Sequence, residues 1–135
     1  MEMNVEQLEL CNSIRRTISE LTATVRNMSK PLLNDISLVE PVHQAIREEL
    51  KGKPHSTIVR VELMVLLYLF NPMLIVSRKH EKNGAFREIS RVMGVEVSNL
   101  SKYKTNLLWH YKTYRDFREL VNGTFEQIVE KTLKK

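Results

Sequence analysis

The strongest constraint on how this chain can fold is the spacing of apolar residues near its start. Residues 4–28 contain neither Gly nor Pro, and apolar side chains recur every three or four residues from Cys11 to Met28. This spacing predicts one long helix that carries the narrow apolar stripe of a coiled coil. The stripe can pack against the same helix of a second chain or against another helix of this chain. In a homodimer we expect the interface to contain Ile14, Ile18, Leu21 and Val25.

The rest of the chain also favours helices, and we predict a single all-α domain over residues 1–135. Hydrophobic residues make up 42% of the chain, and four Gly and four Pro are too few for a protein rich in tight turns. Residues 56–70 are the most apolar segment. Their length and Leu content favour a buried helix, although the alternating pattern at their start also suits a strand. Further helices are expected from Ser37 or Pro41 to Leu50, over 107–120, and over 124–133 after a break at Asn122-Gly123.

Cysteine content and hydropathy indicate a cytoplasmic protein. The single cysteine, Cys11, excludes an internal disulfide and a cysteine-based metal cage, which suits a reducing compartment. Because Cys11 lies on the apolar stripe, we interpret it as a small packing residue rather than a reactive thiol. The acidic N-terminus does not resemble a secretory signal, and the longest apolar run, 63–70, is too short to cross a membrane. We therefore expect no membrane partner.

No grouping of residues indicates catalysis. The four histidines are scattered, without metal-ligand spacing, and the four glycines are too far apart to form a phosphate-binding loop. No nucleophile with a matching base can be argued. We expect neither an enzyme nor a cofactor or metal, and the sequence suggests no small-molecule ligand.

Residues 85–112 carry the most specific pattern in the chain. A short amphipathic helix is expected to end at Gly94, because glycine can adopt a positive φ and let the chain leave the helix abruptly. A second helix then runs to about Thr105. The inward positions of the two helices and the turn are Phe86, Ile89, Ser90, Met93, Val95, Leu100 and Tyr103. This pattern resembles the helix-turn-helix superfamily of DNA-binding proteins, above all bacterial and phage regulators.

The resemblance implies roles for individual residues, with the second helix in the major groove of DNA. Base contacts are expected from Val97, Ser98, Ser101, Lys102 and Thr105. Phosphate contacts are expected from Arg87, Arg91, Asn99, Lys104, Lys79 and Lys82. Because residues 107–120 keep a helical pattern, we predict no β-hairpin wing after the second helix.

Two residues depart from a simple helix-turn-helix pattern. Glu96 stands where such helices often begin with Ser or Thr, and we interpret it as a helix cap in preference to a contact with cytosine. Trp109 would be exposed if the second helix continued unbent. Either the helix ends or bends before Trp109, or its ring packs on another helix or subunit.

The distribution of charge supports a polyanionic partner. Between Arg78 and Arg118 there are ten Lys or Arg and four Asp or Glu, a local charge of +6, whereas the remainder of the chain carries −1. The leading hypothesis is a prokaryotic or phage transcriptional regulator that binds specific double-stranded DNA as a dimer. The alternatives are a DNA-binding accessory factor in packaging, replication or a mobile element, and a helical protein-interaction module without nucleic acid.

Overall fold

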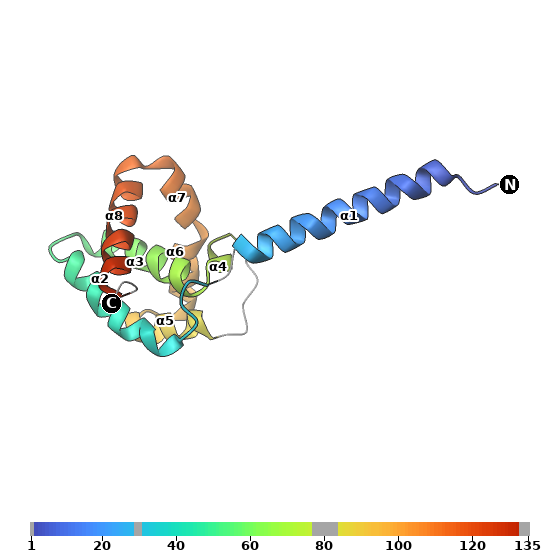
Figure 1. Cartoon of the computed structure of the whole chain (residues 1–135). Helices are drawn as coiled ribbons and strands as arrows, with labels where there is room; N and C mark the ends of the chain where they lie inside the picture. Colours follow the sequence, from blue (N-terminus) through green and yellow to red (C-terminus); the bar gives the residue numbers. More distant parts are fainter. Residues whose placement is uncertain (1, 29–30, 77–83, 133–135) are drawn as a thin grey trace. The chain divides into compact units, whose positions relative to one another are not determined.

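The computed structural model describes residues 2–28, 31–76 and 84–132, and every regular element in these ranges is helical (Figure 1). The all-α prediction is confirmed. None of these helices is long and apolar enough to span a membrane. The chain divides into two compact units, residues 1–30 and 31–135. The elements are α1 (Val5–Met28), η1 (Ile36–Leu38), α2 (Val39–Glu49), α3 (His55–Phe70), α4 (Met73–Val76), α5 (Ala85–Met93), α6 (Val97–Thr105), α7 (Leu107–Thr113) and α8 (Arg115–Thr132).

Within the first unit, residues Val5–Met28 form one helix, α1, as the apolar spacing predicts. The side chain of Asn4 accepts a hydrogen bond from the backbone N–H of Gln7 at 3.1 Å, which satisfies one of the free donors of the first turn. Every side chain from residue 2 to residue 24 is exposed, including the apolar ones. Ile14, Ile18 and Leu21 are 50%, 57% and 60% exposed, so the described part of the apolar stripe is open to solvent.

Helix α3 is the centre of residues 31–135. Ten of its sixteen residues are buried, and it packs against α2, α4, α5, α6 and α8. Residues 56–70 are a helix and not a strand. The sequence left both possibilities open because a fully buried helix and a buried strand show the same unbroken apolar run. Leu63, Leu66 and Phe70 are among its largest completely buried side chains. The core predicted for this segment is confirmed.

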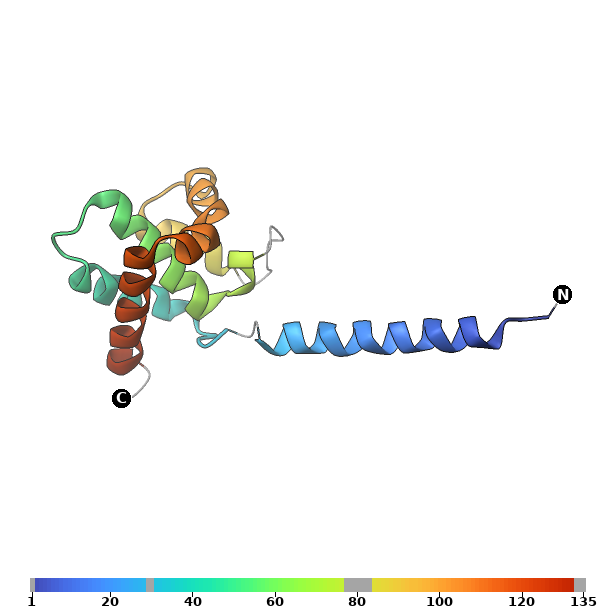
Figure 2. The ribbon, with the colours of Figure 1, turned by 90° about the horizontal axis from the view of Figure 1, so that it is seen from above.

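The last two helices differ from the prediction. We expected a break at Asn122-Gly123, but α8 continues through both residues, as the single orange-to-red helix of Figure 2 shows. The Asn122 side chain accepts a hydrogen bond from the Tyr111 hydroxyl at 2.7 Å instead of ending the helix. Burial of Val121 and Ile128 on one face outweighs the cost of about 1 kcal/mol for a glycine inside a helix. The break occurs earlier, at Tyr114, whose backbone is extended between α7 and α8.

One charged cluster lies inside the core. Glu62 of α3 is completely buried, and its carboxylate contacts Nδ1 of His43 and lies 2.5 Å from Nε of Arg47, both on α2. Desolvation raises the pKa of Glu62 above its ordinary value of 4.5, and the two basic partners counteract that effect only in part. The cluster links α2 to α3 inside the core.

Candidate nucleic-acid interface

Helices α5 and α6 are joined by a three-residue turn that is held by backbone and side-chain hydrogen bonds. Gly94 has φ 69°, as expected for a glycine that ends a helix in the left-handed region. The backbone N–H groups of Gly94 and Val95 both donate to the carbonyl of Ser90, at 3.0 and 3.2 Å. The Ser90 hydroxyl in turn donates to the carbonyl of Val95 at 2.5 Å. Ser90 is therefore both the small residue between the helices and a support for the turn.

Helix α6 has a buried side and an exposed side. Leu100 is completely buried and Tyr103 is half-buried, whereas Ser98, Lys102 and Thr105 are exposed. This is the division expected from helical geometry, since residues three and four apart share a face. Val97 is also exposed, Ser101 is half-buried, and the Thr105 hydroxyl donates to the Ser101 carbonyl at 2.9 Å. The five residues expected to contact bases thus lie on one helix with four of them exposed.

The residues expected to contact phosphate differ in how free they are. Arg87 is exposed on α5. Arg91 pairs with Glu88 on the same helix and approaches Glu40 of α2 at 3.8 Å. These contacts raise the pKa of Arg91 and lower the pKa of Glu88. Arg91 would have to leave its partners to reach a phosphate, so Arg87 is the better candidate of the two.

The other phosphate candidates are dispersed. Lys104 is half-buried, with Nζ 5.9 Å from the centre of the Phe86 ring, so this lysine lies toward α5. Asn99 is exposed and lines a pocket at the side of α6. Lys79 and Lys82 lie outside the described residues.

Glu96 occupies the N-cap position of α6, but its side chain makes no capping hydrogen bond to the described backbone. The helix begins instead with the Glu96 carbonyl, which accepts from the N–H of Leu100 at 2.9 Å. Glu96 is therefore the N-cap residue of α6, as we interpreted it, but its carboxylate does not make the capping hydrogen bond. The shorter side chains of Ser, Thr, Asp and Asn reach the first N–H groups of a helix more readily than Glu does. The Glu96 side chain is exposed at the edge of the pocket.

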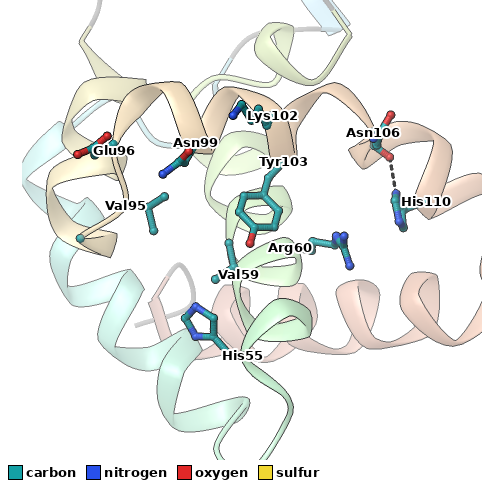
Figure 3. A pocket seen from close by; sticks show the side chains of 11 residues that line it. His55, Val59, Arg60, Val95, Glu96, Asn99, Lys102, Tyr103, Asn106 and His110 are labelled. Carbon is teal, nitrogen blue, oxygen red and sulfur yellow. Dashed lines mark hydrogen bonds between the residues drawn. The ribbon is translucent and has the colours of Figure 1, made fainter.

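A pocket of about 660 Å³ opens beside α6 (Figure 3). It lies between α6, the turn at Gly94, the first half of α3 and the start of α7. Its lining residues are His55, Val59, Arg60, Gly94, Val95, Glu96, Asn99, Lys102, Tyr103, Asn106 and His110. Sequence reasoning missed Arg60 and His55 as site residues, because no local pattern shows that α3 will lie next to α6.

Trp109 lies on α7, after the chain has bent at Asn106. The bend was one of the two outcomes expected for this tryptophan. The residue is 55% exposed, and its ring packs edge-to-face on His110 and Tyr114, with ring centres 5.3 and 5.5 Å apart. These neighbours shield part of the indole but leave an exposed aromatic corner between α7 and α8.

The described residues hold no group of three or more His, Cys, Asp or Glu arranged to bind a metal ion. Comparison of this chain with protein-family models, with curated proteins and with solved structures finds no match.

Proposed function

We propose that this protein binds specific double-stranded DNA through α6 and acts in the cytoplasm as a homodimeric prokaryotic or phage transcriptional regulator. The observation that carries the proposal is the exposed side of α6, where Ser98, Lys102 and Thr105 lie together opposite the buried Leu100. Small polar side chains let a helix approach base edges closely, and a lysine among them can bind a guanine edge or a phosphate. This side of α6 carries no carboxylate.

The surrounding charge supports the same partner. Arg87 on α5 is placed to contact a phosphate beside the groove, which fixes orientation without reading sequence. The region from Arg78 to Arg118 carries a net charge of +6. Binding to any duplex should therefore be measurable and should weaken as salt increases, because cations are released from the DNA.

The homodimer is supported by the exposed apolar stripe of α1, defined by Ile14, Ile18 and Leu21. Two copies of α6 would then read two half-sites about 34 Å apart, one turn of the double helix. The side chain of Val25, also expected at the interface, lies outside the described part of the chain.

The first experiment is a fluorescence-anisotropy titration of random duplex DNA at low and at moderate salt. We expect saturable binding that weakens steeply with salt. Absence of binding at low salt would exclude both the regulator and the accessory DNA-binding roles. The exposed stripe on α1 would then favour the remaining candidate, a helical protein-interaction module.

The second experiment tests whether Lys102 reads a base. Sequences bound by the wild type and by Lys102→Ala are selected from a random duplex library. A base contact is worth about 1–3 kcal/mol of discrimination, so the preference at one position of each half-site should be lost. Lys131→Ala is the control, because Lys131 pairs with Glu49 at the far end of α8 and should leave the selected sequences unchanged. Identical preferences in the wild type and Lys102→Ala would show that Lys102 contacts only the backbone or nothing.

A further inference from the structure

The pocket beside α6 has the size and the charge of a site for a small anion. Its volume of about 660 Å³ falls within the roughly 300–1,000 Å³ that is usual for small-molecule sites. Two permanent cations, Arg60 and Lys102, line it, and neither forms an ion pair with another described residue. Glu96 is the one carboxylate among the lining residues. His55 adds a further side chain that can donate a hydrogen bond, whereas Nδ1 of His110 already donates to the Asn106 carbonyl at 2.8 Å.

One wall of the pocket is apolar. Val59 is buried, Val95 is half-buried, and Figure 3 shows the Tyr103 side chain reaching from α6 toward α3. The guanidinium carbon of Arg60 lies 5.7 Å from the centre of the Tyr103 ring. The arginine is thus held at the edge of an apolar, partly aromatic surface, where water screens its charge less than at an open surface.

From this arrangement we propose that the pocket binds a small organic anion with a flat apolar body, such as an aromatic carboxylate. The carboxylate accepts hydrogen bonds from Arg60, the positive charge of Lys102 adds to the attraction, and the body of the ligand lies against Val95 and Tyr103. Asn99 on α6 supplies an amide that can fix the orientation of the ligand.

The location of the pocket gives the ligand a regulatory effect, a consequence that rests on the proposed function. Lys102 and Asn99 line the pocket and are also expected to contact DNA. An anion bound in the pocket beside Lys102 offsets its positive charge on the DNA-binding side of α6. Bound ligand and bound DNA therefore oppose each other, and by linkage each lowers the affinity of the other by the same factor.

Binding is tested without DNA, by following amide resonances of the full-length protein during titration with sodium benzoate. Benzamide is the matched probe, since it has the same shape without the charge, and inorganic phosphate supplies charge without the flat body. We expect saturable benzoate shifts at Val95, Asn99 and Tyr103, and binding at least about tenfold weaker for each of the two other probes.

Two variants identify the residues that hold the anion. Arg60→Gln and Lys102→Gln should each weaken benzoate binding by about tenfold or more. Arg115→Gln, on α8 and outside the pocket, should leave it unchanged. Arg60→Gln also loses the contact of Arg60 with the Tyr103 ring and could impair folding. In that case Lys102→Gln still tests the proposal. Absence of shifts up to the solubility limit, equal shifts with benzamide, or unchanged binding in Lys102→Gln would overturn the proposal.

The regulatory effect has its own readout. Benzoate should weaken binding of the wild type to duplex DNA and should have no such effect on Lys102→Gln. Because the resonance titration contains no DNA, failure of the pocket proposal leaves the DNA-binding result intact. Failure of DNA binding likewise leaves the ligand titration interpretable.

Discussion

At the scale of single residues, Gly94 and Gly123 provide opposite tests of backbone conformation. Neither glycine has a neighbour within 4 Å of the position where a Cβ would be, so substitution affects backbone energy alone. Gly94 has a positive φ, and Gly94→Ala should lower the free energy of unfolding by about 1–2 kcal/mol. Gly123 is inside α8, and Gly123→Ala should raise it by about 0.5–1 kcal/mol. Chemical denaturation measures the free energy of unfolding of both variants. If both substitutions changed it in the same direction, the left-handed conformation assigned to Gly94 would be contradicted.

Glu62 should make stability fall as pH rises. Its pKa is raised in the folded protein, chiefly by desolvation, so the folded state binds this proton more tightly than the unfolded state does. Stability from this proton is complete below pH 4.5 and is lost as pH rises through the raised pKa. The glutamine of the Glu62→Gln variant does not titrate. In this variant the free energy of unfolding, measured from acidic to neutral pH, should no longer show the decrease that Glu62 causes.

Glu88 serves as the control of opposite sign. The Arg91 side chain lowers the pKa of Glu88, so its contribution is present above pH 4.5 and is lost as pH falls. Glu88→Gln should therefore flatten the acidic side of the profile instead. If Glu62→Gln and Glu88→Gln changed the profile in the same way, the assignment of Glu62 as a desolvated carboxyl group would be wrong.

At the scale of the helices, the apolar stripe of α1 should determine the oligomeric state. Ile18 is 57% exposed in the single chain, and burial of each Ile contributes about 1.5–3 kcal/mol. Ile18→Glu should therefore dissociate the dimer, as measured by sedimentation equilibrium. Ser19→Glu introduces the same residue beside the stripe, at an exposed position, and should leave the dimer intact. A monomeric wild type at high concentration would remove the dimer from the proposal.

The helices also show which features can be predicted from sequence. The apolar spacing predicts α1, and amphipathic patterns on both sides of Gly94 predict α5 and α6, because these signals are local. The continuous α8 was not predicted, since the packing of Val121 and Ile128 and the bond from Tyr111 to Asn122 involve other helices. Arg60 was missed as a pocket residue for the same reason. Its position beside Tyr103 exists only after α3 and α6 have packed.

At the scale of the whole molecule, every residue that the structure describes as buried lies within 31–135. A chain shortened to residues 31–135 should therefore keep its cooperative unfolding transition, as followed by circular dichroism. It should be monomeric and bind a two-half-site duplex more weakly than the full chain does, because each copy then binds alone. Its affinity for a single half-site should be unchanged. Loss of folding on removal of residues 1–30 would contradict the division into two units.

Cys11 gives this chain a chemical label for the direction of pairing. The thiol is exposed and lies on the same stripe as Ile14 and Ile18. In a parallel pair the two Cys11 residues face each other, whereas an antiparallel pair with Cys11 opposite Met28 separates them by about 25 Å. Disulfides require Cα atoms within about 7 Å, so gentle oxidation cross-links only parallel chains. A covalent dimer on a non-reducing gel would therefore show that both α1 helices end, and both copies of residues 31–135 begin, at the same end of the pair.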